Sequence, residues 1–107
     1  MSFNFNQILD EMIAAIAGVI TDEWPKVEAC VKKALTEEEA ALKEIAEARI
    51  AGDIDDADLK SQLEDEKVAL EAALLVCQIK TKVMAQKAAN AAIDVLNVAI
   101  GAAIKAI

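Results

Sequence analysis

The chain has 107 residues, enough for one domain, and 56% of them are hydrophobic although only 3% are aromatic. Its net charge of −8 argues against nucleic acid as a partner, because binding to phosphates requires clustered lysine and arginine. The chain also lacks histidine and tyrosine, which removes common catalytic and metal-binding side chains. We therefore expect a protein that is not an enzyme, with no catalytic, cofactor-binding or metal site.

Two helices are predicted in the first half of the chain, over residues 4–20 and 22–51. Apolar residues recur at three- and four-residue steps from Phe5 to Ile20, which places them on one helix face. Pro25 then falls in the first turn of the second helix, where its missing N–H costs little. Because the residue before a proline avoids helical geometry, Trp24 marks a kink or a short turn.

A turn is predicted at residues 52–55, almost at the midpoint of the chain. Gly52 suits the left-handed position that closes a helix. Asp55 suits the N-cap of the next helix, with Ile54 and Leu59 at the places of a hydrophobic staple. The acidic run from Asp53 lacks the glycine and the glutamate that a calcium loop requires, so we interpret it as a cap and a soluble tip.

The third predicted helix covers residues 56–106, since no glycine or proline appears before Gly101. Such a helix would be roughly 75 Å long and needs a partner of similar length. The first half supplies one if residue i lies opposite residue 107 − i in an all-α, antiparallel helical hairpin. In the favoured version the kinked helices 4–20 and 22–51 form one rod; in the alternative, helix 4–20 folds back on helix 22–51.

The hairpin register places Cys30 opposite Cys77. Without a secretory signal we expect a cytoplasmic protein, and there both cysteines should be reduced thiols that pack as small hydrophobic residues. The alternatives are a redox link across two helices or half of a soft-metal site. In either case the register predicts that the two residues of this possible thiol pair are neighbours.

The two chain ends are apolar, whereas residues 21–66 carry fifteen of the nineteen carboxylates. Residues 88–107 are apolar nearly all round, and one hairpin cannot cover them. The charge-free runs are too short to span a bilayer. We therefore expect a homodimer, packed like a coiled coil into a four-helix bundle. The residues expected at this oligomer or membrane interface are Ile8, Met12, Ile16, Ile93, Leu96, Ile100 and Ile104.

The function expected from these features is that of a self-associating helical scaffold or adaptor. Its partner is a second copy of the chain, with the acidic tip facing solvent. The alternative is a membrane-active, toxin-like or holin-like protein that inserts residues 1–20 and 83–107. Few basic flanking residues and interfacial aromatics are present, which favours the first interpretation.

Overall fold

Helices account for nearly all of the chain. The structure, a computed structural model, describes residues 4–106. The α-helices are α1 (Phe5–Ile20), α2 (Trp24–Ala51), α3 (Asp56–Val76) and α4 (Lys82–Lys105). A 3₁₀ turn, η1 (Thr21–Glu23), joins α1 to α2, and no strand occurs within residues 4–106. The predicted all-α class is thus confirmed.

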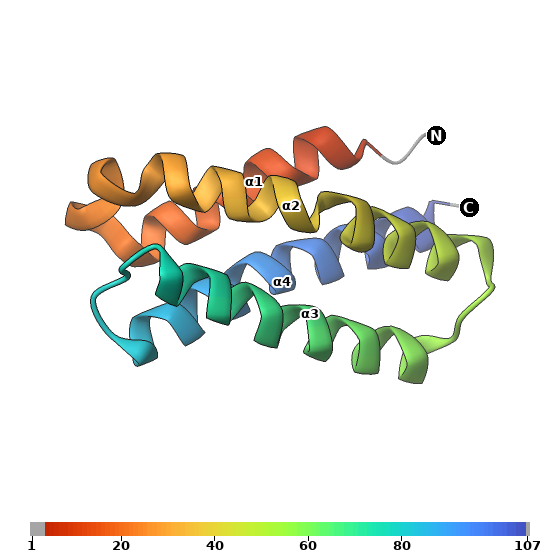
Figure 1. The fold of residues 1–107 in the computed structure, drawn as a ribbon. Helices are drawn as coiled ribbons and strands as arrows, with labels where there is room; N and C mark the ends of the chain where they lie inside the picture. Colours follow the sequence, from red (N-terminus) through yellow and green to blue (C-terminus); the bar gives the residue numbers. More distant parts are fainter. Residues whose placement is uncertain (1–3, 107) are drawn as a thin grey trace.

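The four helices lie side by side and alternate in direction (Figure 1). α1 packs against α4 and α2, while α3 packs against α2 and α4. The molecule measures 40 × 24 × 19 Å along its principal axes. Because 28 residues of α-helix are about 42 Å long, α2 alone spans the longest dimension.

The predicted rod of residues 4–20 and 22–51 is wrong. A straight helix from Phe5 to Ala51 would be about 70 Å long, whereas the molecule measures 40 Å along its longest axis. The chain instead reverses direction at η1, where Thr21 has φ 56° and ψ −109°. α1 therefore folds back on α2 (Figure 1). Pro25 does lie in the first turn of α2, as expected.

The single long helix predicted over 56–106 is also wrong, because the chain turns between α3 and α4. Gln78 adopts φ 65°. The Ile79 N–H donates to the Leu74 carbonyl at 3.4 Å, and the Gln78 N–H donates to the Leu75 carbonyl at 3.1 Å. This is the hydrogen-bond pattern of a Schellman motif, in which glycine usually holds the left-handed position. Here glutamine holds it, so the sequence gives no glycine signal for the turn.

The start of α4 has a side-chain cap. Thr81 has extended backbone geometry, and its hydroxyl accepts a hydrogen bond from the Met84 N–H at 3.0 Å. Threonine is a good N-cap because its oxygen satisfies an N–H that has no partner inside the helix. The α3–α4 loop is thus closed on both sides by hydrogen bonds.

The turn between α2 and α3 agrees with the prediction. Gly52 is left-handed at φ 84°, and the Asp53 N–H donates to the Ala48 carbonyl at 2.9 Å. Asp55 caps α3 by accepting from the Asp58 N–H at 2.8 Å, and the Asp58 carboxylate accepts in return from the Asp55 N–H. This reciprocal pair is a capping box.

The chain therefore reverses direction three times, and each helix runs opposite to the one before it. The start of α1 and the end of α4 lie toward the end that holds turn 52–55, while η1 and the α3–α4 loop lie at the other end (Figure 1). The apolar segments do not project away from the acidic tip, as the rod would require. They run alongside α2 and α3, so one chain supplies all four helices that were expected from two.

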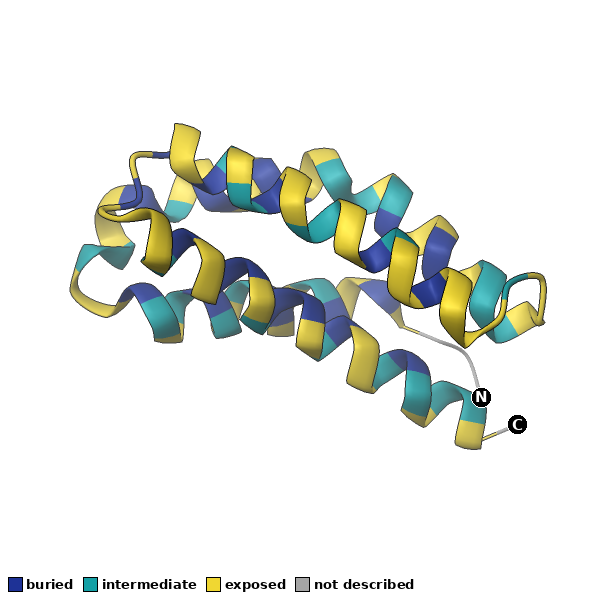
Figure 2. Ribbon diagram, turned by 90° about the horizontal axis from the view of Figure 1, so that it is seen from below, coloured by how far each residue is buried: buried dark blue, intermediate teal, exposed yellow. Residues whose placement is uncertain are grey.

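The core runs along the inner faces of all four helices (Figure 2). Among residues 4–106, no polar or charged residue is fully buried. Four alanines of α4 are inaccessible to solvent and allow the helices to approach closely: Ala85, Ala88, Ala89 and Ala92. α4 makes its most extensive contact with α1, as the pairing of these two segments in the hairpin prediction requires.

Candidate functional site

The residues predicted to form an oligomer or membrane interface lie inside the chain. Ile8, Met12, Ile16, Ile93, Leu96 and Ile100 are all buried, with relative exposures of 0–7%, and Ile104 is half-buried against the core. The reason is the fold-back at η1 and at the α3–α4 loop, which lets α1 and α4 cover each other. These side chains are therefore not available as a surface while the bundle is closed. Residues 1–3 and 107 of the predicted insertion segments lie outside the described residues.

A different face of α4 is exposed and apolar. Val98 is 71% exposed. Beside it a shallow hollow of about 440 Å³ lies between α1 and α4. Its lining is mostly aliphatic, with one carboxylate from each helix: Glu11, Asp94, Val95, Val98, Ala99 and Ala102. We call Asp94, Val98, Gly101, Ala102 and Lys105 the α4 outer face; Gly101 is half-buried and the other four are exposed.

Gly101 on this face has no role in packing within the chain. A Cβ built on Gly101 would meet no atom within 4 Å. Glycine in a helix interior costs about 1 kcal/mol relative to alanine. The packing of one chain therefore gives no reason for glycine here, whereas a close approach by another molecule would.

Cys30 and Cys77, which the register places opposite each other, are joined by a disulfide with a Cα–Cα distance of 5.7 Å. The expectation of two reduced thiols therefore differs from the structure. Cys77 is buried and Cys30 is exposed, so the link runs from the surface of α2 to the interior. The link joins α2 to the C-cap of α3 and closes the end of this helix pair that is farthest from turn 52–55.

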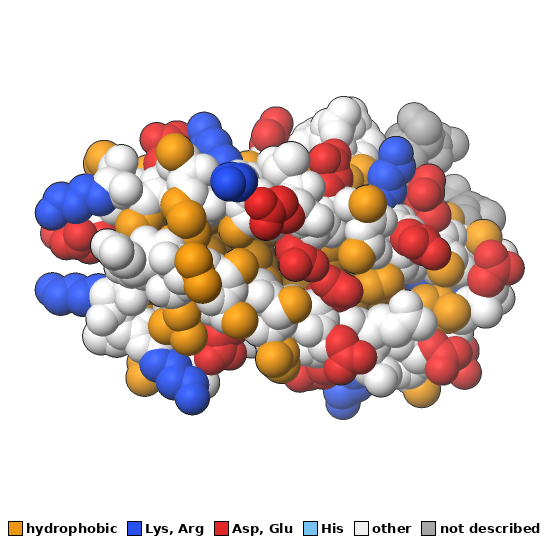
Figure 3. Space-filling view, viewed as in Figure 1, with side chains coloured by type: hydrophobic (Ala, Val, Ile, Leu, Met, Phe, Trp, Pro, Cys, Tyr) orange, Lys and Arg blue, Asp and Glu red, His pale blue; other side chains and the backbone are white. Residues whose placement is uncertain are grey.

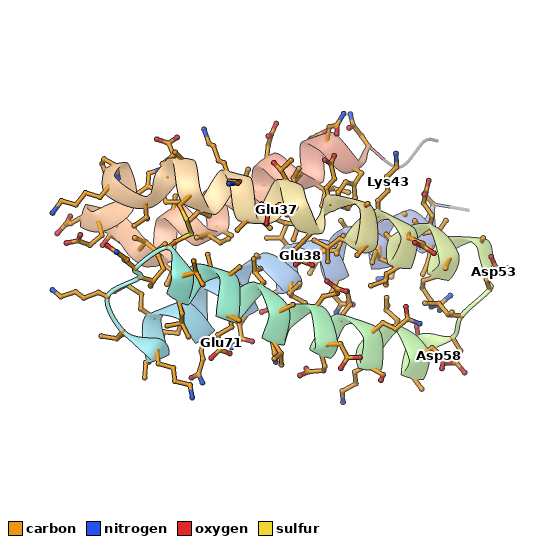
Figure 4. All side chains as sticks on the ribbon, in the orientation of Figure 1. Glu37, Glu38, Lys43, Asp53, Asp58 and Glu71 are labelled. Atoms are coloured by element: carbon orange, nitrogen blue, oxygen red, sulfur yellow. A yellow bond between two sulfur atoms is a disulfide. The ribbon has the colours of Figure 1, made fainter. Side chains whose placement is uncertain are left out.

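Carboxylates gather in the seam between α2 and α3. Glu38 projects from α2 toward α3 (Figure 4), where its carboxyl hydrogen-bonds with that of Glu66. Partial burial, the hydrogen bond with Glu38 and the negative charges of Glu38 and Asp65 raise the pKa of Glu66 to about 7. Below about pH 7 this pair therefore holds a proton, which lets two acidic side chains face each other across the seam.

The acidic seam continues into a second hollow of about 440 Å³ near turn 52–55. Glu44, Asp65 and Glu66 line it together with small apolar residues of α2. No group of residues between 4 and 106 has the arrangement of a metal site. At the turn itself, the hydrogen bond from the Asp58 N–H lowers the pKa of Asp55, as expected for a capping carboxylate. At the acidic tip, Asp55 therefore serves as the N-cap of α3.

α4 alone, among the described helices, is long and apolar enough to cross a membrane by length and composition. The span covers Lys82–Lys105, with a mean hydropathy of 1.3. We expected no span, because the charge-free runs are too short to cross a bilayer. The helix as a whole is nevertheless apolar, since Asp94 is its only carboxylate. A core helix of a soluble protein passes the same test, so the finding by itself does not place α4 in a bilayer.

The comparisons with known proteins give no family and no relative. No protein-family model, no curated protein and no solved structure matches the chain. Any function must therefore be argued from the residues themselves.

Sequence reasoning missed the α4 outer face because it treated residues 88–107 as apolar nearly all round. The break at the α3–α4 loop orients α4, and only then does Val98 point outward while Leu96 points inward. Asp94 and Lys105, one at each end of the exposed stretch, were the available signal. Their helical spacing puts both on the side of Val98.

Proposed function

We propose that the protein is a non-enzymatic, self-associating helical module that pairs with a second copy of itself through the α4 outer face. The observation that carries this proposal is the exposed Val98 beside an apolar hollow, between an acidic and a basic residue of the same helix. The proposed interface is therefore the α4 outer face, and not the residues expected from the sequence, which are mostly buried. The scaffold or adaptor role stays with it, because self-association brings two acidic tips into one assembly.

Charge complementarity supports a second copy as the occupant. If two α4 helices cross antiparallel about a two-fold axis near Ile100, Asp94 of each copy lies opposite Lys105 of the other. The same register places Val98 opposite Gly101 of the second copy. A large side chain then meets a position without one, and each carboxylate meets an ammonium group. Opposite charges in register favour this orientation over the parallel one.

The proposal is tested by light scattering coupled to size-exclusion chromatography, over a range of concentrations. The wild-type protein should be a dimer that dissociates on dilution. Val98→Glu should be a monomer at every concentration, because it places a charge at the centre of the interface. Val68→Glu is the matched control, since Val68 is 63% exposed but lies on α3, away from this face.

Gly101→Ala separates an interface effect from a folding effect. Alanine should stabilise α4, because nothing in the chain obstructs its Cβ. The same methyl group should weaken the dimer by filling the space that Val98 of the second copy needs. A variant that is more stable than the wild type but dimerises less would be explained only by a role of Gly101 in the interface. A monomeric wild-type protein, or dimerisation unchanged by Val98→Glu, would contradict the proposal.

Membrane activity remains a second candidate, because α4 meets the length and hydropathy of a membrane span. Its apolar side chains are buried against α1, so insertion would require the bundle to open. Dye release from lipid vesicles tests this directly. Release by the wild-type protein would support insertion, while intact vesicles alongside a stable dimer would support the self-associating module. Cytoplasmic location stays a prediction.

A further inference from the structure

Exposed apolar residues concentrate at one short stretch of the chain. Among the described residues, the large hydrophobic side chains that are exposed number five, and three of them flank the α3–α4 loop. Val76 is 80% exposed, Val83 is 59% exposed and Leu75 is 40% exposed. Burying a valine is worth roughly 1.5–3 kcal/mol, so leaving these side chains in water is unfavourable unless something covers them.

The charge of this stretch is opposite to that of the whole chain. Residues 72–93 contain no carboxylate and three lysines, in a protein of net charge −8. Lys80 and Lys82 lie in the loop and at the first position of α4, and both are exposed. Acidic side chains are spread over the half of the molecule that holds turn 52–55, whereas hydrophobic side chains gather toward the loop end (Figure 3).

Carboxylates do share this end through η1 and the start of α2. Glu23 and Glu28 each lie within ion-pair distance of a lysine on the same helical segment, Lys26 at 3.7 Å and Lys32 at 2.9 Å. Asp22 of η1 and Glu71 of α3 are the remaining carboxylates toward this end (Figure 4). The three lysines of residues 72–93, Lys80, Lys82 and Lys87, are all exposed and outnumber these two.

The loop is held in place from the inside. Cys77 is tied to α2 by the disulfide, and Ile79 is buried in the core while its N–H closes the end of α3. Alternate residues of the loop thus anchor it, and Val76, Lys80, Lys82 and Val83 point away from the core. A partner would meet these four side chains, the loop-end surface, already positioned, with little ordering cost on binding.

We propose that the loop-end surface docks the protein onto an anionic lipid surface. Valine side chains enter the boundary of the acyl chains while the lysine ammonium groups remain among the anionic headgroups. The end of the bundle is 24 × 19 Å across its Cα atoms, an area of roughly 450 Å². A stable protein interface needs about 800 Å² from each partner, so this small end suits lipid better than a folded protein.

This docking is independent of the proposed self-association. The loop-end surface lies at the start of α4, and the α4 outer face lies toward its other end. Docking also differs from membrane insertion, because it leaves α1 and α4 packed together. The bundle binds the surface as a folded unit.

The experiment is vesicle flotation with the full chain, comparing phosphatidylcholine vesicles with vesicles that also contain phosphatidylserine. The protein should float only with the phosphatidylserine vesicles, and added salt should release it. Lys80→Gln with Lys82→Gln should weaken binding roughly thirtyfold. Val76→Ser with Val83→Ser should weaken it roughly tenfold. Both pairs are exposed, so circular dichroism and the melting temperature should match the wild type.

Matched controls lie outside the loop-end surface: Val68→Ser in the middle of α3, and Lys43→Gln with Lys60→Gln in the acidic half, should leave binding unchanged. Absence of flotation with phosphatidylserine would overturn the proposal, as would equal losses in the control variants. Capture by immobilised polyglutamate without binding to vesicles would also overturn it, in favour of an acidic protein partner. Release of an encapsulated dye would overturn it in favour of insertion. None of these results depends on whether Val98 mediates a dimer.

Discussion

The two helix pairs of this bundle are held together by different means. α2 and α3 carry most of the charge, and their contact is fixed at both ends, by turn 52–55 and by the Cys30–Cys77 disulfide. α1 and α4 carry few charges and have no direct connection, yet they make the most extensive contact in the molecule. The α2–α3 pair is held by a disulfide and a short turn, whereas the α1–α4 pair is held by apolar packing.

This difference determines which parts of the molecule respond to pH and to reductant. The α2–α3 seam tolerates facing carboxylates because its ends are fixed, so its middle responds to pH and its end to reductant. The α1–α4 contact has no such tolerance, since its stability depends on burying small apolar side chains. The variants of the disulfide, Leu96 and Glu66 each act on one pair and should leave the other nearly intact, whereas Thr21→Gly acts at the junction between the pairs.

Removing the disulfide should have the largest effect. The link spans a sequence separation of 47 residues, and closing a loop of that size stabilises the folded state by about 4 kcal/mol in the chain-entropy account. Cys30→Ala with Cys77→Ala should therefore lower the free energy of unfolding by about that amount in a urea titration. Reductant should destabilise the wild type similarly and leave the double variant unchanged. A wild type that is insensitive to reductant would show that the link contributes nothing.

Leu96→Ala should have the next largest effect, and it acts on the α1–α4 pair. Leu96 is inaccessible to solvent, and truncating a buried leucine costs about 3 kcal/mol through lost burial and the cavity that remains. The loss should appear as a lower urea midpoint with an unchanged slope. Val98→Ala, two positions along the same helix but exposed, should change stability by less than about 0.5 kcal/mol. Equal losses for both variants would contradict the orientation of α4.

Glu66→Gln should alter the dependence of stability on pH. The pKa of Glu66 is raised to about 7 from an ordinary value of 4.5, so the folded state binds this proton more tightly than the unfolded state does. The stabilisation that the folded state gains from protonated Glu66 is therefore fully present below pH 4.5 and is lost as pH rises through 7. Glutamine does not ionise, so Glu66→Gln should raise the free energy of unfolding at pH 8 by roughly 1 kcal/mol after solvent screening, with no gain at pH 5.

The matched control for this effect is Glu64→Gln on the same helix. Glu64 pairs with Lys67 at 2.9 Å, so its loss should lower stability slightly at both pH values. Thermal melts of the wild type and the two variants at pH 5 and pH 8 make the comparison. If Glu66→Gln behaves like Glu64→Gln, the carboxyl pair does not share a proton across the seam.

Thr21→Gly should have the smallest effect, at the point where the two pairs are joined. Thr21 has φ 56°, a region that a β-branched residue enters only with strain. Glycine relieves that strain but also frees the unfolded chain, so the expected net gain is about 0.5–1 kcal/mol. A small rise in the melting temperature would support the reversal at η1. A loss would show that the chain does not take this backbone conformation.

The parts of the fold that the sequence predicted are those set by strong local signals. Gly52 and Asp55 identify a left-handed helix end followed by a capped helix start, and both take those roles. The turn then sets a register for the whole chain. That register predicted the neighbours Cys30 and Cys77 and the pairing of the first helix with the last, even though the rod itself was wrong.

The reversal at η1 was only the alternative prediction and the reversal between α3 and α4 was missed, because neither uses the glycine that normally marks a left-handed helix end. Gln78 and Thr21 both adopt positive φ without being glycine. Tertiary packing decides these conformations: folding back at both places lets α1 and α4 bury faces that a straight hairpin would leave exposed. The candidate site could not be predicted without them, because the orientation of α4 determines whether Leu96 or Val98 faces solvent.

The most direct test of the contrast between the two pairs is residue-resolved amide hydrogen exchange, measured on the oxidised and the reduced protein at pH 7. Reduction should lower the protection of α2 around residue 30 and of the last turns of α3. The contact between α1 and α4 around Leu96 should keep most of its protection. Equal loss of protection in both pairs, or earlier loss in α1 and α4, would contradict the account.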